Sequence, residues 1–345
     1  MKRVTIHDVA EAAGVSLATV DRVLNTRPGV RKATIEKVRQ AVERLNYQPD
    51  VFAAGLAKKS AYRLHFLIPN GPNAFMEDLT REARAHAQSM SGARMQVHVE
   101  PIDAFDGHRV TGTLAVLDKS VCDGVAVVAP AFPEVRAAID RLQDRGVPVV
   151  TLVSDHPASA RQHFVGINNV AAGRTAGRLM GRFLPKEPVK IALIAGSLGL
   201  RDHADRYKGC QQVIDTEYPH LELLKVREGR DDNRRNEDVV RKLLSEHPDL
   251  SAVYNIGAGN RGVIAAIRDN GRADDIVFVG HELTPYTRQA LRDGIMDAVI
   301  AQDPGHEIRS AIRVLKALCD GVPIIEDQER IGIDVFLKEN LPEDV

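Results

Sequence analysis

The first 45 residues place apolar side chains at helical spacing in three short segments. In the first segment they recur at i, i+3, i+4 and i+7, which predicts one buried stripe along a helix. The stripe consists of Ile6, Val9, Ala10 and Ala13. Thr5 and Asp8 fit a capping box at its start, since each side chain can bond the other residue's backbone N–H. Gly14 supplies the backbone freedom that ends a helix.

A second helix is predicted directly after this turn. Ser16 is a favourable N-cap, and the buried stripe behind it is Val20, Val23 and Leu24. Two helices joined by so short a turn cross steeply, which is helix-turn-helix geometry. The opposite face of the second helix would lie in the major groove of DNA. That face presents Leu17, Ala18, Asp21 and Arg22. On these residues alone, a small helical bundle without a nucleic-acid role is the alternative.

A third helix is predicted from Thr34 to Leu45, with Ile35, Val38 and Val42 on the face that Leu45 shares. This face is large enough to close a small core over the first two helices, because a helix buries one apolar stripe against its neighbours. The three helices together predict a DNA-binding head over residues 1–45.

Residues 46–60 are predicted to link this head to the rest of the chain. Pro49 lacks a backbone N–H and disfavours helix in Gln48, so the third helix ends before it. The short alanine-rich stretch that follows ends in two lysines. Residues 61–345 then form the main domain.

The main domain has a different pattern, in which short apolar runs alternate with helix-like stretches. This spacing is typical of βαβ units in parallel sheets. The runs restart once, which predicts an α/β fold with two similar lobes of parallel sheet flanked by helices, facing each other across a cleft. The runs are RLHFLI (63–68), MQVHVE (95–100), DGVAVV (123–128), VPVVTL (147–152), VKIALI (189–194), LELLKV (221–226), LSAVYNI (250–256) and DIVFVG (275–280).

The charge distribution supports a DNA-binding head. Residues 1–60 contain eleven lysines and arginines against six acidic residues, whereas the remainder contains 35 basic and 41 acidic residues. The near-neutral net charge of −1 therefore combines a cationic head with an anionic body. Neutralising DNA phosphates requires only the head to be basic.

Other features narrow the class of protein. The N-terminal MKRVTIHD has no apolar run of a signal peptide, and no apolar stretch approaches the ~20 residues that span a bilayer. Cys122, Cys210 and Cys319 are odd in number and lack CxxC spacing, which disfavours disulfides and zinc. No histidine pair has metal-ligand spacing. We therefore expect a cytoplasmic protein that needs no metal or cofactor and has no membrane partner.

The head and linker resemble the lac-repressor (LacI/GalR) family of bacterial transcription regulators. The matching segments are TIHDVAEAAGVSLATVDRVLN, VRKATIEKVRQAVERLNYQP and the hinge with Leu56. By this resemblance, the linker would act as a hinge helix that forms on DNA. The resemblance implies a homodimer, or alternatively a tetramer, on double-stranded operator DNA, with the paired hinges inserting Leu56 into the minor groove. The other DNA contacts that it implies are Thr5, Ser16, Leu17, Ala18, Thr19, Arg22 and Asn25.

The main domain resembles the ribose-binding-protein branch of this family, through NGPNAFMEDL and GHELTPYTRQALRDGIMDAVIAQDPG. The resemblance implies a periplasmic-binding-protein architecture in which the chain crosses between lobes near residues 167, 303 and 330. Lobe 1 would then comprise about 61–166 and 303–330, and lobe 2 about 167–302 and 331–345.

Polar residues at the ends of the predicted strands form a candidate ligand site, because loops from both lobes converge there. Amides, a carboxylate and a guanidinium suit sugar hydroxyls, and an aromatic face suits the C–H side of a sugar ring. By resemblance these positions contact ligand: Asn73, Phe75, Arg206, Asn255, Glu282 and Gln302. We expect Arg206 to open a helix at the cleft edge, where its loss would change the free energy of unfolding little.

Three departures from the family pattern affect the site. The loop NIGAGNRG is one residue longer than usual, so Asn260 is an alternative to Asn255. In TLVSDHP the expected acid is displaced, which makes Asp155 a candidate only by proximity. Arg230 and Asp231 replace the family's aromatic residue, which favours an acidic, phosphorylated or strongly polar ligand.

A rival function rests on Gly257, Gly259 and Gly262, which spell GxGxxG between a predicted strand and helix, with Glu282 twenty residues beyond. That is the dinucleotide fingerprint, and it would suit a nicotinamide-dependent enzyme carrying a DNA-binding head. The fingerprint normally begins its domain, whereas this one follows the third strand of the second lobe. We therefore favour a non-enzymatic, ligand-responsive repressor of a sugar or polyol catabolic operon, with a small polar effector (sugar, polyol or sugar phosphate).

Overall fold

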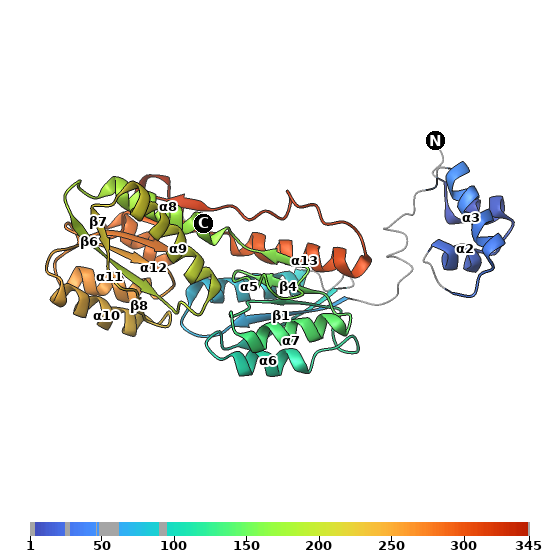
Figure 1. The fold of residues 1–345 in the computed structure, drawn as a ribbon, viewed down its shortest axis with the longest axis horizontal. Coiled ribbons are helices and arrows are strands. Elements are labelled where there is room, and N and C mark those ends of the chain that lie inside the picture. The colour runs from blue at the N-terminus through green and yellow to red at the C-terminus, as the bar shows by residue number, and fades with distance from the viewer. Residues whose placement is uncertain (1–3, 25–27, 46, 48–61, 90–94, 344–345) are drawn as a thin grey trace. The chain divides into compact units, whose positions relative to one another are not determined.

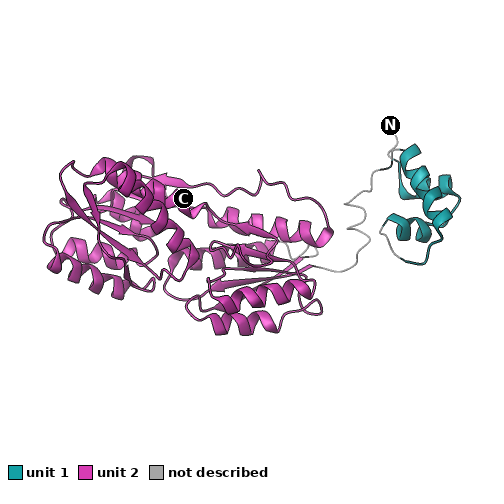
Figure 2. Cartoon of the chain, viewed as in Figure 1, with its two compact units in different colours: residues 1–60 teal, residues 61–345 magenta. Residues whose placement is uncertain are grey.

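The computed structural model describes residues 4–24, 28–45, 47, 62–89 and 95–343. The chain divides into two compact units, residues 1–60 and 61–345 (Figure 2). Asn25, Leu56 and all of the linker except Tyr47 lie outside the described residues.

The first unit contains α1 (Ile6–Ala13), α2 (Leu17–Leu24) and α3 (Lys32–Arg44). Thr5 and Asp8 form the expected capping box on α1, and Gly14 ends it with a left-handed φ of 65°. The third helix begins two residues before the predicted Thr34 and ends one residue before Leu45. The helices enclose a small core of fully or nearly fully buried side chains: Val9, Ala10, Val20, Val38 and Ala41.

The second unit begins with a parallel five-stranded sheet in the order β2-β1-β3-β4-β5. Figure 1 labels two of its strands, β1 and β4. Its strands are β1 (Tyr62–Pro69), β2 (Met95–Ile102), β3 (Gly124–Val127), β4 (Val149–Leu152) and β5 (His163–Val165). Alternate strand residues face opposite layers of helices, as the pleat requires. The helices are α5 (Ala74–Ser89) and α13 (Pro304–Asp320) on one face, and α6 (Gly107–Ala115) and α7 (Pro133–Asp144) on the other.

The second sheet of this unit has the order β12-β11-β10-β9-β6-β7, with β8 also pairing β6. Every strand is parallel to its neighbour except β12, which runs antiparallel to β11. Its strands are β6 (Val189–Ala195), β7 (Leu221–Leu223), β8 (Arg227–Glu228), β9 (Leu250–Asn255), β10 (Val277–His281), β11 (Ala298–Ala301) and β12 (Asp334–Phe336).

Helices also cover both faces of this second sheet. On one face lie α8 (Asn169–Phe183) and α9 (Arg201–Glu217), and on the other α10 (Asn233–Glu246), α11 (Asn260–Asp269) and α12 (Pro285–Arg292). A single 3-10 turn, η1 (Lys338–Asn340), follows β12. The molecule thus has the expected α/β architecture, with a helical head followed by parallel sheets flanked by helices.

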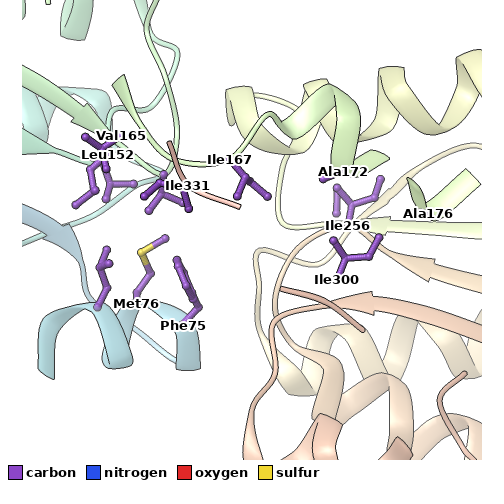
Figure 3. Packing of buried hydrophobic residues seen from close by; sticks show 14 of the residues in the cluster. Phe75, Met76, Leu152, Val165, Ile167, Ala172, Ala176, Ile256, Ile300 and Ile331 are labelled. Carbon is purple, nitrogen blue, oxygen red and sulfur yellow. The ribbon is translucent and has the colours of Figure 1, made fainter. Parts of the chain in front are cut away.

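The chain passes between the two sheets at three places. It leaves the first sheet after β5, returns between β11 and α13, and reaches β12 through residues 321–333. Apolar packing continues across this junction, because Ile167 and Ile331 belong to the same buried cluster as Ala172 and Ile256 (Figure 3). The two sheets are therefore joined by a packed apolar junction.

Short strands account for most differences from the sequence expectation. The predicted strand over residues 221–226 is shortened to β7, and β8 follows separately at 227–228; the two pair different parts of β6. Neither β5 nor β12 is expected from the pattern, since each has only three residues. The helix that carries Arg206 begins at Arg201, so Arg206 lies in its second turn.

Candidate functional site

The candidate DNA-contacting residues lie around the start of α2. Leu17, Ala18 and Arg22 are exposed on this helix, whereas Thr19 is half-buried. The Thr5 and Ser16 hydroxyls are exposed but already serve the helix starts, since Thr5 caps α1 and Ser16 Oγ accepts from the Thr19 N–H at 3.3 Å. The described part of the head therefore presents an apolar and arginine-bearing helix face to solvent.

Two neighbouring hollows lie where the carboxyl ends of both sheets meet. The larger, of about 250 Å³, is lined by Asn73 and Phe75 of the first lobe and by Asn260, Arg261 and Glu282 of the second. The smaller, of about 60 Å³, is enclosed by Asn73, Phe105 and Ser154 on one side and by Asp202, His203, Arg230 and Asp231 on the other. Asn73 lines both, so we treat them as one cleft.

Two contacts bridge the cleft directly. Asn73 Nδ2 donates to Asp231 Oδ2 at 3.2 Å, and its Oδ1 accepts from the Phe75 N–H at 3.1 Å at the start of α5. The Arg230 guanidinium lies over the Phe105 ring, 4.8 Å from the centroid. Arg230 and Asp231 both have positive φ, of 53° and 57°, a backbone conformation that non-glycine residues adopt rarely. The two residues that replace the expected aromatic therefore reach across to the first lobe.

Arg206 lies at the floor of the second-lobe side, and the expectation that it sits at an exposed cleft edge is wrong. Its exposed fraction is 3%. Its Nε donates to Asn169 Oδ1 at 2.8 Å and its Nη1 to the Ile256 carbonyl at 3.0 Å. The helices α8 and α9 approach so closely that a Cβ on Gly173 would lie 1.9 Å from the Arg206 backbone oxygen. That contact, which only glycine permits, fixes the position of the arginine.

Glu282 follows β10 and faces Arg206, with Arg206 Nη2 at 3.7 Å from its Oε1. Gln302, which follows β11, donates from Nε2 to the same Oε1 at 2.9 Å. Burial raises the pKa of Glu282 to about 7, because desolvation outweighs the opposing effects of Arg206 and Gln302. Its φ of 70° is a further strained conformation at the cleft. The structure thus brings three predicted positions, Arg206, Glu282 and Gln302, into one network.

Two acids join this network that the sequence analysis does not identify. Asp202 lies one turn before Arg206 on α9 and lines the smaller hollow. Glu307, in the first turn of α13, is fully buried, and desolvation together with the charge of Glu282 raises its pKa well above the usual range. The sequence gives no signal for this burial, because acidic residues are common in the first turn of a helix.

The two asparagines of the glycine-rich loop have different environments. Asn255 is fully buried and donates to the Ala258 carbonyl and to Asn260 Oδ1. Asn260 lines the larger hollow beside Asn73 and donates to the His281 carbonyl at 2.8 Å. Asn260, the alternative weighed from the loop length, therefore lies nearer the cleft space, and Asn255 supports it from below.

The structure does not bring Asp155 to this network. Its carboxylate accepts two hydrogen bonds from Arg161, at 2.6 and 2.7 Å. It lines a separate hollow next to the junction between the two sheets. The preceding residue, Ser154, lines the smaller hollow of the cleft, and its Oγ has no partner among the described residues. The backbone changes direction at Val153, whose φ is 63°, and this reverses which side chain faces the cleft.

The glycine-rich loop is shaped by packing. A Cβ on Gly262 would lie 1.7 Å from the Asn233 backbone oxygen, and one on Gly257 would lie 2.4 Å from Asp231 Oδ1. The Ala258 N–H, which a pyrophosphate would need, donates to that same carboxylate oxygen at 3.0 Å. An anion bound here would face Asp231 directly, which disfavours the dinucleotide interpretation.

The described residues hold neither a candidate metal cluster nor a helix that could span a membrane. No cluster of three or more histidine, cysteine, aspartate or glutamate side chains in the described ranges could hold a metal ion. None of the helices described is both long enough and apolar enough to cross a membrane.

Comparisons with known proteins agree with this architecture. Residues 65–323 match the family model "Periplasmic binding protein domain", and residues 5–50 match "Bacterial regulatory proteins, lacI family". The ribose operon repressor of Halalkalibacterium halodurans is 28% identical over 284 residues, 81% of each chain. Catabolite control protein A of Priestia megaterium is 28% identical over 286 residues, 81% of this chain and 83% of its own.

Among solved structures, a glucose-galactose binding protein from Geobacillus stearothermophilus superposes with a TM-score of 0.74 at 22% identity. The match covers 83% of this chain and 100% of the other. At that identity the likeness shows the fold alone. The match over residues 65–323 means that this chain belongs to the periplasmic binding protein domain family. With its lacI-family head and its curated relatives, the chain is a ligand-responsive, DNA-binding transcriptional regulator.

Proposed function

We propose that the protein is a cytoplasmic, homodimeric repressor of a catabolic operon, and that a small polyhydroxylated effector in the cleft controls its hold on operator DNA. The observation that carries the proposal is the cleft itself. Side chains from two lobes meet there around buried polar atoms, which is how a hinged protein encloses a polar ligand. The ribose and sugar-binding relatives named above support a sugar or polyol as effector.

The proposed mechanism is a shift between open and closed arrangements of the lobes. Asn73 and Phe105 on one side approach Asp231 and Arg230 on the other. A ligand that touches both sides favours the closed arrangement by the difference between its affinities for the two states. The first lobe follows the linker directly along the chain. In a homodimer, closure of the two lobes would therefore change how its two heads bind the symmetric half-sites of the operator.

On DNA we propose that α2 occupies the major groove and that Arg22 contacts guanine, since it is a long donor on the exposed face of this helix. Arg22→Ala is expected to cost about 1–3 kcal/mol of operator binding and to relax specificity at one base pair in each half-site. Lys37→Ala, an exposed cation on α3, serves as a charge-matched control.

The experiment selects binding sites from random DNA with wild type and variants, then titrates the selected operator with and without effector. We expect a pseudo-palindromic site, a changed profile for the Arg22 variant only, and an effector-dependent change in DNA affinity. An unchanged profile would remove Arg22 from the base contacts. DNA affinity that no sugar, polyol or sugar phosphate alters would contradict the effector proposal.

A further inference from the structure

In the described ranges, most of the buried atoms at or beside the cleft that lack a hydrogen-bond partner are carboxylate or amide oxygens; the exceptions are Ser154 Oγ and His281 Nδ1. Among the residues that the structure describes, no donor reaches Asp202 Oδ1, Glu282 Oε2, Gln302 Oε1 or either carboxylate oxygen of Glu307. The one buried side-chain nitrogen without a partner in the same set is His281 Nδ1. Since an unsatisfied buried polar atom is costly, the cleft is arranged for a ligand that brings donors.

The buried charges at the cleft are unbalanced in the same direction. Three buried carboxyl groups line the cleft, those of Asp202, Asp231 and Glu282, and the buried carboxyl group of Glu307 interacts with Glu282 behind it. Arg206 is the only arginine that is buried within the described residues, and two of its nitrogens already donate to Asn169 and to a backbone carbonyl. The region shielded from water therefore holds more carboxyl groups than cationic side chains.

The other arginines that line the cleft are exposed. Arg230 lies over the Phe105 ring at the cleft mouth. Arg261 lines the larger hollow and lies over the Tyr286 ring, 4.9 Å from its centroid. His203 is buried, and its Nδ1 accepts from the Ser197 N–H at 3.4 Å. Its Nε2 lies 3.7 Å from Asp202 Oδ2, too far for a hydrogen bond.

We propose that the effector carries a protonated amine beside its hydroxyls, as in an amino sugar or amino alditol, and that this ammonium binds between Glu282 and the neighbouring acids. This inference rests on the proposed function, because it specifies the ligand of the same cleft. An ammonium has three donors and no acceptor, which matches both the unpartnered oxygens and the excess of carboxyl groups.

The same contacts argue against a phosphorylated effector, one of the ligand classes that Arg230 and Asp231 favour when considered from sequence. A phosphate brings acceptors and negative charge. In the glycine-rich loop, Asp231 Oδ1 already accepts from the Ala258 N–H at 3.0 Å, so the backbone donor that would bind a phosphate is occupied by an acid.

The protonation of the cleft gives the proposal a distinctive signature. Burial raises the pKa of Glu282 to about 7 and that of Glu307 well above its usual range, so protons neutralise these acids when no cation is bound. Arg206, Gln302 and Asp202 act on Glu282, whereas Glu282, Arg206, Asp303 and Asp202 act on Glu307. An ammonium would displace a proton, so its affinity should rise as pH increases through about 7, provided the amine stays charged.

The test is a calorimetric titration of the full-length protein with matched pairs of probes. The pairs are glucamine and sorbitol, and glucosamine and glucose, with N-acetylglucosamine as the sugar whose amine has lost its charge. Glucamine is used for the pH series, because its aliphatic amine, like that of lysine, stays protonated near neutral pH. We expect at least one amine to bind tenfold or more tightly than its neutral partner and to release protons, measured in two buffers of different ionisation heat.

Variants locate the effect. Glu282→Gln keeps the shape of the side chain and should reduce the preference for the amine to less than threefold, with loss of the proton release. Glu222→Gln removes an exposed carboxylate on β7 in the same lobe and should keep both. Glu307→Gln provides a second variant if Glu282→Gln does not fold, and it should weaken the amine more than its neutral partner.

The outcomes separate this inference from the proposed function. A neutral sugar or polyol that binds as tightly as its amine, without proton release, would overturn the amine proposal and leave the sugar effector standing. No heat and no thermal stabilisation from any probe, together with DNA affinity that none of them changes, would contradict both.

Discussion

The two lobes of residues 61–345 are both parallel sheets covered by helices on each face, yet they contribute unequally to the cleft. The second lobe supplies a connected, buried network around Arg206, with Glu282 and Gln302 hydrogen-bonded at its centre. The first supplies separate groups, Asn73, Phe75, Phe105 and Ser154, of which Asn73 and Phe105 contact the second lobe, and a single buried acid, Glu307 on α13, that interacts with the network. We infer that the second lobe is preorganised to bind the ligand and that the first lobe closes over it.

The largest expected effect breaks the second-lobe network. Arg206→Leu should lower the free energy of unfolding of the main domain by about 3–5 kcal/mol without any ligand, because it leaves buried groups of Asn169 and Glu282 without their cation or donor. Urea unfolding followed by circular dichroism measures this. The matched control is Arg201→Leu on the same helix, whose exposed pair with Asp205 should be worth less than about 1 kcal/mol.

If Arg206→Leu and Arg201→Leu lower the free energy of unfolding by the same small amount, the network is not preorganised. The comparison between the lobes would then have to be abandoned, since the second lobe would hold its groups no more firmly than the first.

A second prediction uses pH. Because the pKa of Glu282 is raised from 4.5 to about 7 in the folded state, the unfolded chain loses its proton first as pH rises. The contribution of this group to stability therefore falls between about pH 4.5 and 7, by an amount on the order of 3 kcal/mol, and is constant above. The difference in unfolding free energy between wild type and Glu282→Gln, measured from pH 5 to 8, should follow this course. A difference that does not vary with pH would show that Glu282 titrates normally.

The smallest effect tests the first lobe. Asn73 both caps α5 and donates to Asp231, so Asn73→Ala should cost about 1 kcal/mol of unfolding free energy. Asn73→Ser keeps a capping oxygen but loses the donor, so its unfolding should be within about 0.5 kcal/mol of wild type. Its ligand-free radius of gyration, measured by X-ray scattering, should nevertheless increase as the lobes separate. Identical scattering from both proteins would mean that this hydrogen bond does not hold the lobes together.

The sequence was sufficient for features that depend on neighbours along the chain. The capping box of Thr5 and Asp8, the left-handed Gly14 and the helices of the head follow from local hydrogen bonding and from the spacing of apolar residues. The long buried strands β1 and β6 follow from apolar runs bounded by polar segments. The candidate residues at strand ends could be named because parallel strands bring those ends to one edge.

The tertiary structure alone decided which of those residues share one environment and how they are protonated. Ser154 takes the place expected for Asp155 next to the turn of the backbone at Val153. Glu307 becomes a buried acid only because the chain crosses back after β11 and packs α13 against the first sheet. The strand β12 pairs with β11 from more than thirty residues away. Local rules carry the energies of caps and periodic burial, whereas desolvation and charge interaction depend on every group that packs nearby, whatever its distance along the chain.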